Sequence, residues 1–427
     1  MNRFSVDNRT IVAWLPVGLL MALMPTLLFP IFPAQRAVLI MLVLAWIVDV
    51  IVNRRWEGWR MSGEKWVFAL MIVFFLITPL HQLFDIPATT YYHQQIERRL
   101  PFLVVGLMGL VGFSEKLRVR YIGYAMLLSG VAALVTVLIL QGVDGHLQLE
   151  EFRYWFNLTR HMNIASHMEY NLYLNIALVM GFHALQSRVP RAVKIAIVIA
   201  MFACFGMLLI SDGRVGMLTA LLMVLVLGLR LPAVRRYAWV TGVLVILIAG
   251  GALWHICRNP RFSWEYVRQE TRLVVWDYSV EMIKEKPWVG YGLSSLSEEY
   301  VTKAYEHQGM REIYFGQLLQ LPEFSERPRD MYLIHPHSTF LEITLEHGVI
   351  GLFVLLGLII AAAAVRMRPQ DKWYYAMTLA AIMLQACFEP LGKYFPPILI
   401  CVTIFVWIYG VERRSEVKSE LPSQTSD

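Results

Sequence analysis

Charged residues are scarce in this chain, and their scarcity decides its class. Only 16% of the 427 residues are Asp, Glu, Lys or Arg, while 57% are hydrophobic; charged residues make up about 25% of an average soluble protein. Many apolar runs are roughly 18 residues or longer, which is the length that crosses about 30 Å of hydrocarbon as a helix. A transmembrane barrel would instead have short alternating segments. The sequence therefore predicts an all-α, polytopic membrane protein.

Cysteine is also scarce, with four residues in the whole chain. Cys204, Cys387 and Cys401 lie inside apolar runs, Cys257 lies at the end of one, and no CxxC spacing occurs. This pattern excludes a disulfide framework and a cysteine metal site. Internal repeats and low-complexity segments are absent too. The formal net charge is +6, and in a membrane protein such an excess reflects cytoplasmic loops rather than nucleic-acid binding.

The apolar runs predict about twelve membrane spans. They lie near residues 11–29, 34–52, 66–81, 100–113, 121–141, 166–186, 194–211, 215–229, 238–256, 340–365, 373–390 and 396–411.

Basic residues predict the orientation of these spans, because cytoplasmic loops are enriched in Lys and Arg. Every even-numbered span is followed by a basic cluster, and the clusters are Arg54, Arg55, Arg60 and Lys65; Lys116, Arg118 and Arg120; Arg188, Arg191 and Lys194; Arg230, Arg235 and Arg236; Arg366, Arg368 and Lys372; and Arg413, Arg414 and Lys418. Both termini are therefore expected in the cytoplasm. The predicted domains are 1–256 with spans 1–9, an outer loop domain 257–339, spans 10–12 over 340–411, and a cytoplasmic tail 412–427.

His337 lies where the long outer loop turns back into an apolar run. Pro336 favours the first turn of a helix, so we expect His337 at the helix N-terminus, where the helix dipole disfavours the charged imidazolium. A neutral imidazole can act as a general base. The spacing of His335 and His337 matches no strong metal signature, so no metal site is predicted. Gly348 and Gly351, further along the same run, are expected to mark close helix packing.

Two arginines in outward-facing segments are candidates for binding an anion. Arg214 lies in a short turn between two glycines, and Arg272 precedes Trp276 and Val280 on one face of an expected amphipathic helix. A guanidinium matches phosphate oxygens and keeps its charge. The ordinary alternative for Arg214 is an arginine that reaches the membrane interface or pairs with Asp212. For Arg272 and Trp276 the ordinary alternative is a surface helix with a structural tryptophan.

Several other outer polar residues are weaker candidates. Arg160 could join an anion site, whereas His161 and His167 near the start of the sixth span are expected to be structural. Glu389, at the outer end of the eleventh span, should have a partner because an ionised side chain near membrane depth is costly alone.

Three stretches, occurring in the same order as in the family, resemble the motifs of the O-antigen ligase and polymerase superfamily. They are Gly213-Arg-Val-Gly216; Thr271-Arg272 with Trp276 and Pro287-Trp-Val-Gly-Tyr-Gly292; and His337-Ser-Thr-Phe-Leu-Glu342 with Glu346-His-Gly-Val-Ile-Gly351. Ser338 replaces the usual asparagine, Gly213 a serine and Thr271 a glycine, while both arginines and the histidine are kept.

The resemblance implies a bacterial inner-membrane glycosyltransferase with a GT-C-like scaffold and a site that faces the periplasm. It implies metal-independent, inverting transfer of O-antigen from undecaprenyl pyrophosphate to lipid A–core, without a cofactor. His337 would be the catalytic base, and Arg214 and Arg272, with Arg160, would bind the pyrophosphate. Two siblings in the superfamily remain alternatives: an O-antigen polymerase and a protein O-oligosaccharyltransferase. A transporter or lipid flippase is a more distant alternative, which paired broken helices in two halves would favour.

Overall fold

A computed structural model of the chain describes residues 8–29, 32–57, 60–82, 90–143, 167–210, 213–230, 236, 250, 270–315, 336–391 and 396–411. Within these ranges every regular element is helical, as the composition predicts. The helices are α1 (Asn8–Leu28), α2 (Phe32–Val52), α3 (Lys65–Gln82), α4 (Thr90–Val111), α5 (Val119–Val143), α7 (His167–Leu185), α8 (Arg191–Ile210), α9 (Arg214–Gly228), α13 (Thr271–Glu285), α14 (Gly292–Glu306), the π-helix η3 (Met310–Phe315), α17 (Thr339–Ala363), α18 (Lys372–Phe388) and α19 (Pro396–Gly410).

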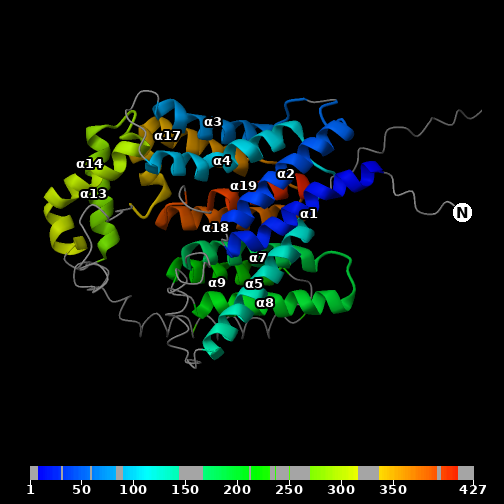
Figure 1. Ribbon diagram of the computed structural model, residues 1–427. Helices are drawn as coiled ribbons and strands as arrows, with labels where there is room; N and C mark the ends of the chain where they lie inside the picture. Colours follow the sequence, from blue (N-terminus) through cyan, green and yellow to red (C-terminus); the bar gives the residue numbers. More distant parts are fainter. Residues whose placement is uncertain are drawn as a thin grey trace, which may run out of the picture.

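Apolar helices form a layered bundle around α18 and α19. Helices α3, α4 and α17 pack together on one side, and α5, α7, α8 and α9 form a group on the other (Figure 1). The C-terminal helices connect the two groups, since α18 contacts α7 and α9 while α19 contacts α4 and α5. A single large apolar core runs through these helices, because each has at least one face without charge.

Helices α13 and α14 lie together at one end of the bundle, at the left in Figure 1. Both contact α17, and α14 also contacts α3 and α4. They share a separate small core with η3, built from Val275, Tyr278, Met282, Tyr300 and Met310. Helix α13 buries Val275, Tyr278 and Met282 in this core, while its apolar residues Leu273 and Val280 remain exposed.

Among the residues that the structure describes, five helices are long and apolar enough to cross a membrane, and the chain is a membrane protein. They are Asn8–Leu28, Pro33–Val52, Val119–Ile139, Arg191–Leu209 and Thr339–Ala363. Shorter apolar helices lie at Lys65–Leu80, Val215–Gly228 and Pro397–Gly410. Each span expected from the sequence coincides with a helix, except 238–256, which lies outside the described residues apart from residue 250. The number of twelve spans stays a prediction.

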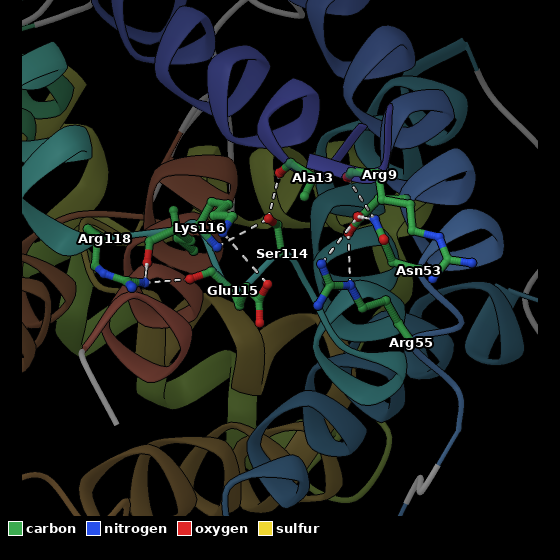
Figure 2. A network of polar contacts seen from close by, with 10 residues as sticks. Arg9, Ala13, Asn53, Arg55, Ser114, Glu115, Lys116 and Arg118 are labelled. Atoms are coloured by element: carbon green, nitrogen blue, oxygen red, sulfur yellow. Dashed lines mark hydrogen bonds and ion pairs between the residues drawn. The ribbon is translucent and has the colours of Figure 1, made fainter. Parts of the chain in front are cut away.

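A polar network ties together three chain segments that the sequence predicts on the cytoplasmic side (Figure 2). Asp49 is fully buried and accepts hydrogen bonds from Asn53 Nδ2 at 2.7 Å and Arg55 Nε at 3.2 Å. Ser114 Oγ, after α4, donates to the carbonyl of Ala13 in α1 at 2.5 Å. Asn53 Nδ2 also lies 3.4 Å from the carbonyl of Arg9 in α1, so hydrogen bonds connect the start of α1 to the ends of both α2 and α4.

Candidate active site

His337 has a backbone conformation that few residues other than glycine adopt. Its φ is +48°, in the left-handed region, and Arg54 is the other described non-glycine residue with a positive φ. Ser338 is the N-cap and α17 begins at Thr339. The expectation that Pro336 lies in the first turn of this helix is therefore wrong, because the left-handed residue turns the chain before the helix begins. Such conformations cost about 1–3 kcal/mol and cluster at functional sites.

Glu389 connects two of the residues that the sequence singles out. Its Oε1 accepts a 3.1 Å hydrogen bond from Nη2 of Arg272, and its Oε2 lies 3.9 Å from Nδ1 of His337. The Glu389 side chain is 6% exposed, whereas those of Arg272 and His337 are 28% and 29% exposed. Three distant chain segments thus form one charged cluster, with its carboxylate buried and its two basic ends accessible. Arg272 is therefore the charged partner that the sequence predicts for Glu389.

The backbone around Glu389 is held by the first residue of α17. Thr339 Oγ1 donates to the carbonyl of Glu389 at 2.7 Å and accepts from the amide of Leu391 at 2.8 Å. Glu389 itself is extended, just beyond the end of α18. Since Thr339 is two residues from His337, the same short segment fixes both the histidine and the carboxylate beside it.

The polar atoms that face each other in this cluster retain hydrogen-bonding capacity. Within the described residues, Nδ1 of His337 and Oε2 of Glu389 have no hydrogen-bond partner, and their 3.9 Å separation exceeds hydrogen-bond range. A protonated Nδ1 that closed this gap would leave Nε2 as the acceptor nitrogen of a neutral imidazole. Trp276 Nε1, one helical turn from Arg272, is another buried donor without a described partner.

The turn Pro287–Gly292 exchanges backbone hydrogen bonds with α17. The amide of Tyr291 donates to the carbonyl of Leu345 at 2.7 Å, and the amide of Val349 donates to the carbonyl of Pro287 at 2.8 Å. Between these two bonds, Gly348 has φ +64° and ψ −164°, so α17 is interrupted there. The backbone groups freed by the interruption are satisfied by the turn, as buried backbone must be.

Two glycines allow this close approach. A Cβ at Gly290, where φ is +68°, would lie 2.5 Å from the carbonyl oxygen of Leu345, and a Cβ at Gly348 would lie 2.5 Å from the amide nitrogen of Val289. Gly348 therefore does mark close packing, as expected, but the partner is a turn of the outer segment rather than a helix. The second and third sequence motifs meet directly at this contact.

Tyr291 joins the turn to α13, the helix that carries Arg272. Its single hydroxyl proton is shared between the carbonyl of Met282 at 3.0 Å and Oε2 of Glu285 at 2.9 Å. Burial raises the pKa of Tyr291, and the hydrogen bond to Glu285 raises that pKa further, so the phenol stays a neutral donor. Tyr291 thus fixes α13 against α17 through its side chain on one side and its amide on the other.

A buried charge cluster lies at the interruption of α17. Arg99 in α4 is 0% exposed and donates from Nη2 to Oε2 of Glu346, whose side chain is 2% exposed. Its Nη1 donates to Thr78 Oγ1 at 2.9 Å and lies 2.8 Å from Nε2 of His347. These contacts fix the first half of α17, which follows His337, to α3 and α4.

The first motif begins α9. Gly213 is the N-cap of this helix, and Gly216 packs against Asn171 of α7, where a Cβ would lie 2.5 Å from the Asn171 Cβ. Asn175 Nδ2 donates to the Gly216 carbonyl at 3.1 Å. The side chain of Arg214 and all of Arg160 lie outside the described residues, so their expected place near Arg272 stays a prediction.

Residues 199–356 match the family model described as O-antigen ligase. The matched region contains Arg214, Arg272 and His337, and it confirms the resemblance that the three motifs indicated. Over 88 residues the chain is 33% identical to a Rickettsia conorii protein named "Putative polysaccharide ligase", and the matched part covers 21% of this chain and 18% of that protein. The chain thus aligns with less than a fifth of that relative's length.

Sequence reasoning did not find the Arg99 cluster or the role of Glu389 as the link between Arg272 and His337. Arg99 follows Glu97 and Arg98 directly before an apolar run, a pattern typical of a membrane-interface flank. Helix α4 begins at Thr90, however, so Arg99 lies well inside the helix. The available signal was the adjacent pair of ionisable residues Glu346 and His347 in an otherwise apolar segment, which requires a charged partner.

Proposed function

We propose that this protein is an O-antigen ligase that transfers O-antigen polysaccharide from undecaprenyl pyrophosphate to lipid A–core oligosaccharide. The observation that carries the proposal is the convergence of Arg272, Glu389 and His337 within a chain whose residues 199–356 match the O-antigen ligase family. A base and a cation that lie beside one buried carboxylate suit a displacement in which a proton and a pyrophosphate must both be removed.

The proposed reaction is a single displacement with inversion. The acceptor hydroxyl oxygen attacks the anomeric carbon of the donor, and the bond between that carbon and the phosphate oxygen breaks. His337 takes the hydroxyl proton, and undecaprenyl pyrophosphate leaves with the bonding electron pair. A positioned general base contributes about 10²–10⁴ in rate.

Glu389 would select the tautomer of the base. Its Oε2 is nearest to Nδ1 of His337, so a hydrogen bond from Nδ1 would leave Nε2 free to accept the proton. As the imidazolium forms, the carboxylate would stabilise its charge. This is the division of work between histidine and carboxylate that catalytic triads use.

The arginines would stabilise the leaving pyrophosphate. Among the described contacts, Arg272 uses one N–H on Glu389, and a guanidinium has five donors, so donors remain for phosphate oxygens. Arg214 and Arg160 would add positive charge on the same side of the membrane. Positive groups aimed at charge that develops in the transition state lower the barrier.

The test is transfer by purified protein in proteoliposomes, with lipid-linked O-antigen as donor. We expect product when lipid A–core is the acceptor and undiminished product in the presence of a chelator. Arg272→Ala should lose transfer and weaken donor binding, while Arg272→Lys should recover part of both because it keeps the charge without the bidentate geometry. Arg311→Ala, an exposed arginine of η3, is the control that should behave as wild type.

The same assay distinguishes the ligase from the alternative functions of the superfamily and from a transporter. Elongation of a second lipid-linked glycan, without transfer to lipid A–core, would make the protein a polymerase. Transfer to a periplasmic polypeptide would make it a protein oligosaccharyltransferase. Transport of the lipid-linked glycan without any glycosyl transfer would contradict enzymatic function altogether.

A further inference from the structure

The turn between α13 and α14 exposes two apolar side chains. Residues 287–293 contain no charged side chain, and Trp288 and Val289 within them are 70% and 53% exposed. None of the reaction steps proposed above uses either side chain. The position of the turn along α17 indicates which surroundings these side chains meet.

The level at which the turn contacts α17 gives its depth in the membrane. Helix α17 is long and apolar enough to cross a membrane, and its 25 residues extend about 36 Å. Gly348, whose backbone contacts Trp288, lies about 14 Å from the N-terminal end of the helix. A hydrocarbon layer of about 30 Å, centred on the helix, begins about 3 Å from that end. The turn therefore meets α17 about 10 Å inside the hydrocarbon, and it would meet α17 at the boundary if the first half of the helix lay along the membrane surface.

Hydrogen bonds make the backbone of the turn compatible with this depth. Irregular backbone is costly among lipid chains unless its polar groups are paired. Pro287 has no N–H to pair, and the amide of Gly290 donates to the carbonyl of Lys286 at 3.2 Å. The two hydrogen bonds with α17 described above pair the carbonyl of Pro287 and the amide of Tyr291. These bonds also keep the turn at its level on α17.

The exposed face of α17 next to the turn is apolar. Ile350 and Phe353 are 50% and 67% exposed, and they share one face of the helix with Ile360, which is 66% exposed. The helix has no charged residue after Gly348. On a helix that crosses a membrane, such a face contacts lipid chains. The carbonyl group of Trp288 lies against Gly348, so the exposed turn is at the level where this lipid-facing surface begins.

We propose that this turn inserts into the bilayer and that Trp288 contacts phospholipid acyl chains near their headgroups, in the leaflet that the N-terminal end of α17 enters. The turn adjoins the lipid-facing surface of α17, and tryptophan is enriched at this level of membrane proteins because its ring is apolar while its N–H binds polar groups. Polar contacts begin directly beside the turn, since Nζ of Lys286 lies 3.1 Å from Oε2 of Glu299. Tyr291 connects the turn to α13, so the inserted turn would set the depth of that helix. The proposal does not depend on the reaction proposed above.

The experiment measures the surroundings of residue 288 in proteoliposomes of phosphatidylcholine and phosphatidylglycerol. A nitroxide spin label is attached to Trp288→Cys in the full chain, with the four native cysteines replaced by alanine. Collisions of the label with oxygen, which concentrates among acyl chains, are compared with its collisions with a water-soluble nickel chelate. We expect the ratio of oxygen to nickel collisions to be several-fold higher than in the control Asp277→Cys, an exposed residue of α13, and close to the ratio in Phe353→Cys.

Two results of this measurement would overturn the proposal. A ratio at residue 288 as low as that at residue 277 would place the turn in water. Exclusion of both reagents would mean that protein covers the turn, and spin–spin broadening between labels would identify that protein as a second copy of the chain. A thermal midpoint equal to that of the cysteine-free chain excludes misfolding of the labelled variant.

A second measurement uses the chain with its native cysteines. The difference in tryptophan emission between wild type and Trp288→Phe is the emission of Trp288, and phenylalanine keeps an apolar ring in the turn. We expect this emission to be quenched by phosphatidylcholine brominated on its acyl chains and to be insensitive to aqueous iodide. Quenching by iodide, without quenching by the brominated lipid, would contradict insertion.

Discussion

Removing Arg99 should destabilise the protein because Arg99 is the buried partner of a buried carboxylate. Arg99 is 0% exposed, and Glu346 and His347 beside it each have 2% side-chain exposure. Arg99→Met would leave the Glu346 carboxylate without its cation in a site from which water is excluded. Breaking a buried ion pair in this way costs about 3–5 kcal/mol.

The double variant isolates the cause. Arg99→Met with Glu346→Met removes both charges, and replacing a buried ion pair by apolar residues of similar volume is often nearly neutral. The hydrogen bonds of Arg99 to Thr78 and His347 are still lost, at about 0.5–1.5 kcal/mol each. We therefore expect the double variant to recover at least 1 kcal/mol, by the same estimate.

The assay is equilibrium unfolding in mixed micelles, followed for wild type, both single variants and the double variant. The cycle gives the coupling free energy between Arg99 and Glu346 directly. Additive effects of the two substitutions, or an Arg99→Met variant as stable as wild type, would refute the reasoning that a buried ion pair anchors the first half of α17.

Three further predictions follow from other contacts. Glu389→Gln should lower the transfer rate about 10²-fold with donor affinity largely kept, and Glu389→Asp should recover part of it; equal rates for Gln and wild type would contradict a role in holding His337. Gly348→Ala should lower the free energy of unfolding by roughly 2 kcal/mol or more, because a left-handed φ and the Trp288 backbone both oppose a Cβ. The control is Gly357→Ala, which should be neutral or stabilising because a Cβ there meets nothing within 4 Å. The pKa of Asp371 lies below its ordinary value, because hydrogen bonds from His183 and Arg368 outweigh the opposing effect of burial. The stability of wild type relative to Asp371→Asn should therefore be constant above about pH 5 and shrink as the pH falls through about 4 and below. A difference in thermal midpoint between the two proteins that stays constant as the pH falls through this range would contradict the prediction.

The helical architecture follows from features that are local in the sequence. An apolar run of sufficient length can satisfy its backbone in a membrane only as a helix or a closed barrel, so composition alone predicts an all-α protein. The ends of the helices are less predictable. Helix α4 extends ten residues N-terminal of the expected span and thereby takes Arg99 into its interior, because Thr90 to Arg99 can form a helix even though the segment is polar.

The interruption of α17 could not be predicted because its cause lies elsewhere in the chain. A glycine within an apolar helix normally indicates close packing with another helix, which is what the sequence predicts for Gly348. The helix breaks because the turn Pro287–Gly292 supplies the hydrogen bonds that the interruption removes. The sequence identified both segments through the family resemblance, but their contact joins residues more than fifty positions apart.

The candidate site was partly predictable for the same reason. His337 and Arg272 belong to motifs that can be recognised in the sequence, and Glu389 stood out as a carboxylate that needed a partner. The convergence of these three residues depends on the packing of α13 and α18 with the start of α17, which is a tertiary property. The orientation of the spans relative to the membrane stays a prediction.

The central claim is that His337 is the base of a glycosyl transfer whose leaving group is bound elsewhere. The most direct measurement is a single-turnover transfer assay with donor binding measured in parallel, for wild type, His337→Ala and His307→Ala. His307 is the matched control, a partly exposed histidine of the same outer segment that pairs with Glu281 at 3.4 Å. We predict that His337→Ala loses transfer by about 10²–10⁴-fold and keeps donor affinity, while His307→Ala transfers as wild type. Transfer by His337→Ala at the wild-type rate would contradict the claim.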